Sequence, residues 1–515
     1  MASRDFAKMS SRLYDVLIVG GGIHGATIGY HCAKAGLHSV VLEKQDFAAA
    51  TSANSLKILH GGLRYLQHLN FKRMRHSICS RREMMALAPD LVEPLPCMMP
   101  LSGGGLKGKA VMRAALFAND CIGFDRNRSL PEDIHLPRGH VVGKEACIAA
   151  IPGITTDELR GAAIWYDGLG LNTERMVLEY ILGSLHYGGD AANYAEVTSM
   201  EKHDTYYLLN VEDKLSGETY QLKTKYLVNG AGPWFEECCG LRKKDIHPKQ
   251  NWAMALNIVS RKKIFAKYAV ALEGNRSYED KDAIVKRGKR LYFFVPWRDR
   301  TMIGTEYEPC TEHPETFRAS RESIQKMVDE VNAIYPAAEL AYEDISFYQA
   351  GLVPMKTSGQ GGDIQLAKNS LFYFHEDDGY ERVISVKGVK YTTAPHIAKQ
   401  IVAELTKKLE PAADRATTPY ISAIQGSRNE FAAEDMDGHV LGKEIRQMIE
   451  GEMACKLSDI VFRRTGLGTA ECPAMETLQK ITDCMADVFG WSATRKEEEL
   501  EEVLKRYEPL ADRNS

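Results

Sequence analysis

Hydrophobic and polar positions follow two different periods within the first fifty residues. A short apolar run, Tyr14–Val19, is typical of a buried strand. It leads into glycines and then into a segment of helical character, Ala26–Ala35, which Gly36 ends. A second apolar run, Ser39–Leu42, predicts another strand. The pattern therefore predicts one β-α-β unit over residues 14–43.

Later segments extend this mixed pattern. Leu222–Asn229 has the composition of another buried strand. Arg290–Val295 and Thr301–Gly304 alternate between polar and apolar positions, which favours a half-buried antiparallel sheet that could cover a ligand. From about residue 430 the chain is charged and mostly helical, and we expect a boundary in the loop-like segment 410–428.

Composition and charge narrow the class of protein. A chain of 515 residues exceeds one ordinary core, so two or three structural units are expected. The formal net charge of −4 gives no electrostatic reason to expect a nucleic-acid partner. The 11 cysteines are scattered without a C-x-x-C pair, which favours a reducing compartment and predicts no metal site.

Membrane contact is a separate question. No apolar stretch approaches the length needed to span a bilayer, and the N-terminus lacks a secretory pattern, so we expect a cytoplasmic protein. Residues 71–88 carry four arginines and one lysine at helical spacing: Lys72, Arg73, Arg75, Arg81 and Arg82. We interpret them as a solvated helix face, and a basic helix at a membrane surface is the alternative. Peripheral attachment to the inner face of the membrane stays open because it needs no spanning helix.

The glycines after the first strand fit the dinucleotide pattern G-x-G-x-x-G. Gly20 allows the tight turn, Gly22 lets the backbone approach a pyrophosphate, and Gly25 lets helix and strand pack closely. The helix that follows presents free N–H groups to phosphates. Glu43, at the end of the second strand, can accept hydrogen bonds from ribose hydroxyls. This motif predicts a dinucleotide site and does not by itself separate NAD from FAD.

The residues after Glu43 read KQDFAAATSANSLKILHGGLRYLQH. This run resembles the flavin-linked glycerol-3-phosphate dehydrogenases of the D-amino-acid-oxidase-like superfamily, whose pattern is roughly Q-D-x-A-x-x-T-S-x-x-S-x-K-L-I-H-G-G-L-R-Y-L. Further matches are NGAGPW at 229–234, FVPW at 294–297, IGT at 303–305, GVKYTT at 388–393 and RRTG at 463–466. The resemblance covers about 14–509 and implies FAD as the cofactor.

The resemblance also implies the architecture. We expect an α/β protein with a Rossmann-like FAD-binding domain, an antiparallel-sheet substrate domain and a C-terminal helical domain. The expected FAD-binding domain is discontinuous and takes residues 1–90, 148–235 and 350–410. The substrate or cap domain takes 91–147 and 236–349, and the helical domain takes 411–515.

The expected cofactor contacts follow the matched motifs. Small hydroxyl residues and glycines can wrap closely around an extended phosphate and ribityl chain. The residues expected to contact FAD are Gly20, Gly22, Gly25, Glu43, Lys44, Thr51, Ser52, Ser55, Lys57, His60, Gly61, Gly62, Val197, Ala231, Gly232, Gly388, Lys390 and Thr392.

The chemistry implied by the resemblance is oxidation of a secondary alcohol by hydride transfer to the flavin while a base takes the hydroxyl proton. His60 is the candidate base because an imidazole titrates near neutrality, and the alternative is that it only hydrogen-bonds the cofactor. Lys390 could stabilise an alkoxide or the reduced flavin. Arg64 is also a catalytic candidate, and Arg64, Tyr65, Lys368 and Lys390 are expected on the substrate side.

Departures from the family pattern concentrate where the substrate would bind. The family's A-G-L-R-P-L is here AGLVPM, so Val353 stands where an arginine is associated with the substrate phosphate. Lys368 also replaces an arginine, and Ala394 and Pro395 replace a tyrosine and an arginine. The family's aspartate after I-G-T-T and the histidine of K-G-S-H are missing as well. A valine cannot make the paired, charge-assisted hydrogen bonds that an arginine gives a phosphate.

Three functions follow from these observations. The first is oxidation of sn-glycerol 3-phosphate to dihydroxyacetone phosphate, with electrons passed to a quinone at the membrane. The second is a flavin dehydrogenase or oxidase of the same fold that acts on another small polyol or hydroxy acid, with oxygen as a possible acceptor. The third is a flavin-binding structural or sensor protein without turnover, which the retained His60, Arg64 and Lys390 disfavour.

Overall fold

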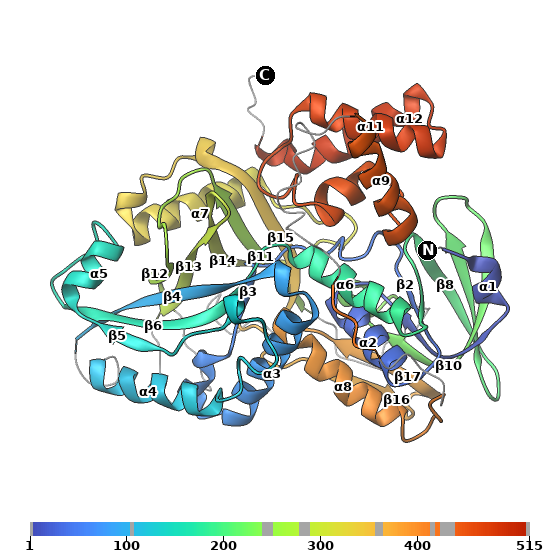
Figure 1. The fold of residues 1–515 in the computed structure, drawn as a ribbon, viewed down its shortest axis with the longest axis horizontal. Coiled ribbons are helices and arrows are strands. Elements are labelled where there is room, and N and C mark those ends of the chain that lie inside the picture. The colour runs from blue at the N-terminus through green and yellow to red at the C-terminus, as the bar shows by residue number, and fades with distance from the viewer. Residues whose placement is uncertain are drawn as a thin grey trace.

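The protein, studied as a computed structural model, forms two β-sheets and a C-terminal group of helices (Figure 1). The structure describes residues 4–103, 108–238, 251–277, 289–355, 364–412, 418–422 and 438–510. Much of the predicted boundary segment 410–428, namely residues 413–417 and 423–428, lies outside these residues.

The first sheet has eight strands and is parallel at its centre. Its main order is β16-β17-β10-β1-β2-β7, with β9 joined to β10 and β8 to β9. β16 and the β8–β9 pair run antiparallel to their neighbours, and the strands from β17 to β7 are parallel. The strands are β1 (Leu13–Val19), β2 (Ser39–Leu42), β7 (Asp190–Ala192), β8 (Ala195–Lys202), β9 (Tyr207–Asp213), β10 (Thr219–Asn229), β16 (Leu371–His375) and β17 (Tyr380–Lys387).

The predicted β-α-β unit opens this sheet. β2 has the predicted bounds, and β1 begins one residue earlier than predicted. The helix between them, α2 (Ile23–Lys34), begins three residues before the predicted Ala26, because Gly22 already serves as its N-cap. Both strands are buried on two sides, which explains why their apolar runs are continuous rather than alternating.

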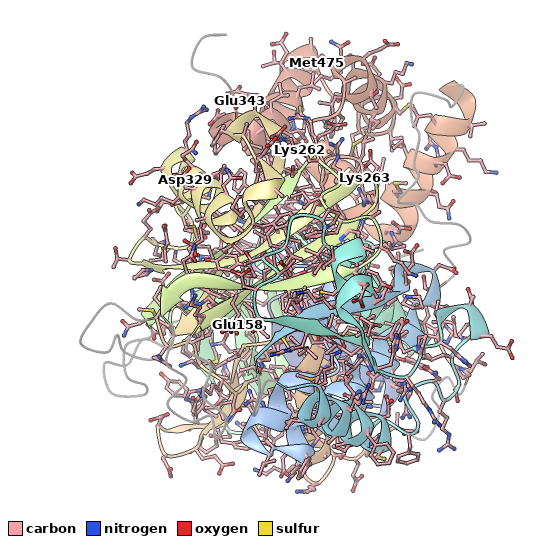
Figure 2. All side chains as sticks on the ribbon, turned by 90° about the vertical axis from the view of Figure 1, so that its left-hand side faces the viewer. Glu158, Lys262, Lys263, Asp329, Glu343 and Met475 are labelled. Carbon is pink, nitrogen blue, oxygen red and sulfur yellow. The ribbon has the colours of Figure 1, made fainter. Side chains whose placement is uncertain are left out.

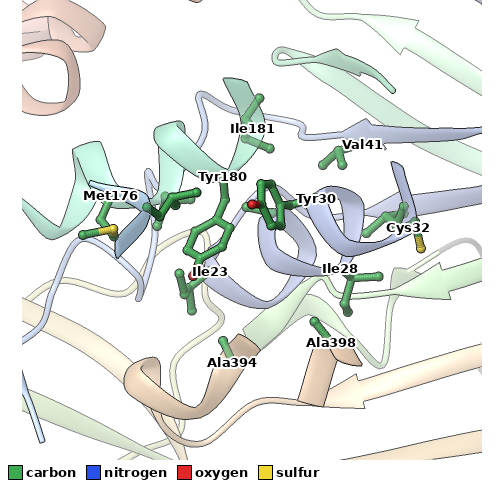
Figure 3. Packing of buried hydrophobic residues seen from close by; sticks show 14 of the residues in the cluster. Ile23, Ile28, Tyr30, Cys32, Val41, Met176, Tyr180, Ile181, Ala394 and Ala398 are labelled. Carbon is green, nitrogen blue, oxygen red and sulfur yellow. The ribbon is translucent and has the colours of Figure 1, made fainter. Parts of the chain in front are cut away.

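Helices cover the first sheet and bury its core. α2 packs on α6 (Thr173–His186) and on α8 (Ala394–Leu405). Figure 3 shows Tyr30 of α2 against Tyr180 and Ile181 of α6, with Ala394 and Ala398 of α8 on the other side. The ring centroids of Tyr30 and Tyr180 lie 5.3 Å apart in an edge-to-face arrangement. This packing fixes the direction in which the N-terminus of α2 points.

The second sheet has nine strands, and all but one of its pairings are antiparallel. Its main order is β15-β11-β14-β13-β12-β4-β6-β3, with β5 beside β6, and the β12–β4 pair is parallel. The predicted segments Arg290–Val295 and Thr301–Gly304 lie within β13 and β14, which pair antiparallel as expected. The strands are β3 (Ile58–Leu59), β4 (Val92–Ser102), β5 (His140–Val142), β6 (Leu159–Gly170), β11 (Asn251–Ser260), β12 (Ala269–Ser277), β13 (Lys289–Trp297), β14 (Arg300–Cys310) and β15 (Ile345–Met355).

Membership of the two sheets bears on the expected domain limits. Strand β6 pairs in the second sheet although it falls within the range 148–235 that we expected in the FAD-binding domain. Strand β15 also pairs there, although its second half falls within 350–410. The division into domains itself stays a prediction. Helices α4 (Lys109–Ile122), α5 (Lys144–Ala150) and α7 (Arg321–Ile334) accompany the second sheet.

Helix α3 (Phe71–Leu87) corrects the interpretation of 71–88 as a solvated face. Met74, Ile78 and Met84 are buried, and so is the guanidinium of Arg81, which pairs with Asp167 of β6. The basic residues of this helix therefore include one with a structural role. The interpretation failed because helical spacing of charges does not reveal a buried partner far along the chain.

The C-terminal helices are α9 (Gly438–Glu452), α10 (Leu457–Asp459), α11 (Met475–Phe489) and α12 (Ala493–Leu504), followed by the short helix η12 (Lys505–Leu510). They lie together over one side of the molecule, across from α4 (Figure 1). Met475 lies at the same end of the molecule as Glu343 and Lys262 of the second-sheet region (Figure 2). Leu441, Ile445 and Val503 share one buried core with residues of the second sheet, so these helices are packed into the protein.

Candidate active site

The glycine turn after β1 brings three backbone segments into close contact. Gly20 has a φ of +105°, and a Cβ there would lie 2.5 Å from the carbonyl oxygen of Gly230. A Cβ on Gly25 would lie 1.8 Å from the carbonyl oxygen of Gly20. The N-terminus of α2 therefore sits directly against the ends of β1 and β10, where its free N–H groups form a site for phosphate.

Glu43 lies beside this turn. Its carboxylate accepts hydrogen bonds from the backbone N–H of Gly21 at 2.6 Å and of Gln45 at 2.9 Å. Burial raises the pKa of Glu43, while these two N–H groups and Lys44 partly offset the effect. The carboxylate is thus fixed at the position from which it could accept hydrogen bonds from a ribose.

A cavity of about 440 Å³ opens at the turn. Most of the residues expected to contact the cofactor line it, although they come from six separate stretches of the chain. These lining residues are Gly20, Gly22, Glu43, Lys44, Thr51, Ser52, Ser55, Val197, Ala231, Gly232, Gly388 and Lys390. Ser52 joins two of the stretches, because its hydroxyl accepts a hydrogen bond from the backbone N–H of Ile23 at 2.9 Å.

Three expected cofactor residues lie behind the cavity walls. Gly25 packs against Gly20, as described above. The backbone N–H of Gly61 donates to Asp167 at 2.6 Å. The ammonium of Lys57 is buried and donates to Glu174 at 2.6 Å and to the Thr173 hydroxyl at 2.9 Å. The side chain of Lys57 therefore ties the segment before β3 to α6 and does not face the cavity.

A second cavity, of about 470 Å³, adjoins the first. The two share Leu56, Thr305, Tyr307, Lys390 and Tyr391 as lining residues. The second cavity is also lined by His60, Gly62, Tyr65 and Thr392, which the sequence analysis placed near the flavin or substrate. Its cationic lining residues are Lys289, Arg290 and Lys390, and Asp167 is the one carboxylate among its described lining residues.

His60 and Asp167 form a pair at the wall of this second cavity. Nδ1 of His60 lies 3.1 Å from Oδ2 of Asp167, and the imidazole is 48% exposed. Burial disfavours the charge on Asp167, but the hydrogen bond from His60 and the Arg81 guanidinium outweigh it and lower the pKa of the carboxyl to about 2. An ionised carboxylate only accepts hydrogen bonds, so Nδ1 carries a hydrogen, and in the neutral imidazole Nε2 is then the nitrogen that can accept a proton.

Asp167 was missed by the sequence analysis. The signal available was a single carboxylate inside the otherwise apolar and aromatic run GAAIWYDGLG of β6. A buried carboxylate in such a run needs partners, and here they are Arg81, His60, the Gly61 backbone and the indole N–H of Trp165 at 3.2 Å. Most of these partners lie far along the chain. The run alone therefore indicates that the carboxylate has partners, but it does not identify them.

Lys390 and Tyr65 meet at the junction of the two cavities. The ammonium of Lys390 donates a hydrogen bond to the Tyr65 hydroxyl and lies 4.5 Å from the centre of its ring. Burial favours the neutral phenol, but Lys390 and Arg73 outweigh it, so the pKa of Tyr65 is lowered. A positive charge is therefore held close to the site where a substrate oxygen and a flavin could meet.

His24, within the glycine motif, is a second residue that the sequence analysis missed. It lines the first cavity, and its Nε2 is buried without a partner among the described residues. Burial lowers the pKa of His24 to about 4, so the ring is neutral at physiological pH. Gly388 leaves room for this ring, because a Cβ there would lie 2.4 Å from it. The neutral Nε2 can therefore exchange a hydrogen bond with a bound cofactor.

Three further positions that the sequence analysis assigned to the substrate side are Arg64, Lys368 and Val353. The side chain of Arg64 lies outside the described residues. Lys368 lies in the segment before β16 and is partly buried. Val353 lines the first cavity together with Trp252 and Tyr307, so the position that carries an arginine in the family pattern does face the site.

Comparison with known proteins bears on this geometry. Residues 15–405 match the family described as FAD dependent oxidoreductase. The chain belongs to this family. Residues 413–496 match the C-terminal domain of alpha-glycerophosphate oxidase. The protein is thus an FAD-dependent oxidoreductase, and the expectation of FAD as its cofactor is confirmed.

Several relatives resemble the chain over most of its length. A glycerol-3-phosphate dehydrogenase of Synechocystis is 25% identical over 99% of this chain and 98% of its own. An alpha-glycerophosphate oxidase of Enterococcus casseliflavus is 27% identical over 82% of this chain and 66% of its own. The crystal structure of the glycerol-3-phosphate dehydrogenase from Bacillus halodurans complexed with FAD has a TM-score of 0.69 at 20% identity, covering 99% of this chain and 97% of that one. The expected fold class is confirmed by this likeness.

The residues of the first cavity fit FAD. The close packing of Gly20, Gly25 and Gly230 leaves the helix N-terminus open to phosphate, and Glu43 lies where a ribose would bind. The buried Nε2 of His24, which has no partner among the described residues, offers a further polar contact.

No helix among the described residues is long and apolar enough to cross a bilayer.

Proposed function

We propose that the protein oxidises sn-glycerol 3-phosphate to dihydroxyacetone phosphate. The observation that carries this proposal is the second cavity, where the His60–Asp167 pair and the cations Lys289, Arg290 and Lys390 surround a space continuous with the cofactor cavity. An anionic hydroxy compound matches this charge, and relatives named for this substrate resemble the chain from end to end.

Each residue has a stated role in this proposal. Bound FAD would accept the hydride. Nε2 of His60 would take the proton of the substrate hydroxyl, and Asp167 would hold the imidazole in the required tautomer and balance the charge that forms. Lys390 would stabilise the developing alkoxide from the junction of the cavities. Arg290 and Lys289 would attract the phosphate in place of the arginine that Val353 has replaced.

The test is anaerobic mixing of the purified flavoprotein with glycerol 3-phosphate while the flavin absorbance is followed. The proposal expects full bleaching that saturates with substrate. Glycerol at the same concentration is the matched control, because it has the same carbons and hydroxyls without the phosphate. Bleaching by neither compound would favour a flavoprotein without this turnover.

A second candidate is the oxidation of another small polyol or hydroxy acid. Val353 favours it, since this side chain lines the first cavity, which adjoins the proposed substrate cavity, and offers no hydrogen bond to a phosphate. Rapid bleaching by an unphosphorylated polyol or a hydroxy acid such as lactate, with none by glycerol 3-phosphate, would replace the first proposal with this one.

The electron acceptor is proposed to be a quinone at a membrane surface. Helix α4 contributes Met112 and Ala115 to the second cavity, while its outer face leaves Phe117 72% exposed, and Phe124, just beyond the helix, is 80% exposed. Val111 and Arg113 are also exposed on α4, and Leu69, Phe71 and Lys72 are exposed at or just before the start of α3, a helix that contacts α4. An amphipathic face of this kind suits the interface of an anionic bilayer.

This part of the proposal has its own experiment. The wild type should float with vesicles that contain anionic lipid, and the double change Phe117→Ser and Phe124→Ser should abolish flotation. Phe489→Ser, which alters a 40% exposed phenylalanine on α11, is the control and should float normally. Reoxidation by oxygen as fast as by a soluble quinone, together with no flotation of the wild type, would indicate an oxidase instead.

A further inference from the structure

The segment 46–55, here called the cofactor loop, joins the first sheet to the second. It supplies Thr51, Ser52 and Ser55 to the first cavity. Within the loop, the Asn54 amide donates to the carbonyl of Ala50 at 2.9 Å. Short irregular segments need outside contacts to hold one conformation, because each ordered residue loses backbone entropy. The contacts of the two ends of the loop therefore decide whether the cavity is formed before FAD arrives.

One end of the loop is held by Arg463 and Arg464, which lie between α10 and α11 in the C-terminal region, in the short helix η11 (Ile460–Arg464). The carboxylate of Asp46 accepts two hydrogen bonds from Arg464, at 2.6 and 2.9 Å, and a further one from Nε of Arg463. The amide of Asn193 completes the set at 2.8 Å. Burial disfavours the charge on Asp46, but Arg464 and Arg463 more than offset it and hold the pKa of the carboxyl well below its usual range.

The other end of the loop is held by the same part of the chain. The guanidinium of Arg506, in η12, donates to the side-chain oxygen of Asn54 at 3.0 Å, and that oxygen also accepts from the backbone N–H of Ala350 at 3.1 Å. The guanidinium lies 4.8 Å from the ring centre of Tyr348 and is thereby kept in place. Arg506 thus joins the loop to β15, which carries Val353.

The arginines on the C-terminal side are themselves anchored. Arg464 has no exposed side-chain surface and donates to the carbonyl of Glu452 at 2.8 Å. The Glu452 carboxylate pairs with Arg175 of α6, and Arg463 donates to Asp459 at 2.6 Å. Because these charges are buried, moving any one of them would leave another without a partner, so the network favours a single arrangement.

We propose that the C-terminal helical region is a clamp for the cofactor loop, in which Arg463, Arg464 and Arg506 are positioning residues for FAD. They touch the loop rather than the cavity, and they act through Asp46 and Asn54. The clamp preforms the wall that carries Thr51, Ser52 and Ser55, so that FAD binds without paying the full cost of ordering that wall.

Arg506→Gln tests the clamp at its less buried end in the full-length protein. Apoprotein is titrated with FAD while flavin fluorescence is followed, and the melting temperature of the apoprotein is measured alongside. Loss of the charge-assisted contact to Asn54 should raise the dissociation constant for FAD by about tenfold and leave the melting temperature of the apoprotein unchanged. Arg506→Lys keeps a cationic donor and should restore part of the affinity.

Arg446→Gln is the matched control. Arg446 is an exposed arginine of α9 that pairs with Glu450 on its own helix, away from the loop. This variant should bind FAD as the wild type does. Equal affinity of the Arg506 and Arg446 variants would overturn the proposal. So would a loss of affinity in Arg506→Gln accompanied by an equal loss of apoprotein stability without rescue by lysine.

The buried end needs a balanced change, because removing Arg464 alone would leave Asp46 charged in the interior. Asp46→Asn combined with Arg464→Gln removes one charge of each sign and leaves Arg463 paired with Asp459. This double variant should release FAD at least tenfold faster than the wild type. An unchanged release rate from a folded double variant would remove Asp46 from the clamp.

Discussion

The two cavities differ in how their walls are held. Around the first, the glycine turn uses backbone contacts, and the cofactor loop is fixed by buried charges. Around the second, the imidazole of His60 is half exposed, and it takes its orientation from one buried carboxylate on β6, that of Asp167. The wall of the first cavity is thus held rigidly, as the proposed cofactor site requires, whereas the second cavity leaves His60 able to meet the proposed substrate.

This contrast predicts that a mutation can slow the reaction without weakening FAD binding. The largest effect on the reaction rate is expected for His60→Ala. Without its proton acceptor, the reductive half-reaction should slow by roughly 10²–10⁴-fold, while FAD content stays at the wild-type level. Anaerobic stopped-flow measurement of flavin bleaching checks both points. His140→Ala, which changes an exposed histidine of β5, should leave the rate unaltered. Loss of FAD from the His60 variant would break the contrast.

At the first cavity, a mutation is expected to weaken FAD binding without acting on the proposed base. In Gly22→Val, the new Cβ would lie 2.9 Å from the Ser52 hydroxyl that receives the Ile23 N–H, and the branches would enter the cavity. Overpacking of this kind costs about 1–3 kcal/mol, which corresponds to roughly a 10–100-fold weaker affinity for FAD. The flavin-to-protein ratio after gel filtration measures it. Gly442→Val in α9, where nothing lies within 4 Å of a new Cβ, is the control and should retain FAD.

The contribution of Asp167 to the free energy of unfolding should depend on pH. Its folded pKa of about 2 lies below its ordinary value of 3.8, so its ionised form stabilises the fold above pH 4, and this contribution is lost as the pH falls toward 2. The contribution is about 2 kcal/mol in the free energy of unfolding. Urea unfolding of Asp167→Asn should therefore differ most from the wild type near pH 6 and converge with it as the pH approaches 2. A difference between Asp167→Asn and the wild type that does not change with pH would contradict the assignment.

Val353→Arg should give the smallest effect. A guanidinium at this position of the first cavity's wall could add a charge-assisted contact to a phosphate and lower KM for glycerol 3-phosphate by about tenfold. Steady-state kinetics with a soluble quinone as acceptor measures the change. Val353→Gln is the control, since it adds similar bulk without charge. An equal KM in both variants would place the phosphate away from β15.

The contrast also explains what could be predicted from the sequence. The β-α-β unit was predictable because its two strands, its glycine turn and its helix lie within one short stretch of the chain. The residues on the reaction side belong to distant segments. Asp167 lies 107 residues from His60, and Lys390 lies 325 residues from Tyr65.

Buried ion pairs account for the expectations that failed. Lys57 was expected at the cofactor and Arg81 at the solvated face of its helix, yet each pairs with a buried carboxylate, Glu174 and Asp167 respectively. A lysine or arginine in a sequence motif indicates that a positive charge is required there. Only the folded structure shows which carboxylate or ligand that charge pairs with. The placement of the individual cofactor contacts stays a prediction for the same reason.

The strand order of the first sheet has a consequence for synthesis of the chain. β1 leaves the ribosome well before its parallel partner β10, which ends at residue 229, and before the next strand, β17, which ends at residue 387. At about 5–20 residues per second, β1 and its apolar neighbours wait on the order of tens of seconds for those partners. Pairings so far apart in sequence also form slowly. Until β10 and β17 have been synthesised, the apolar residues of β1 lack their sheet partners and are exposed to aggregation.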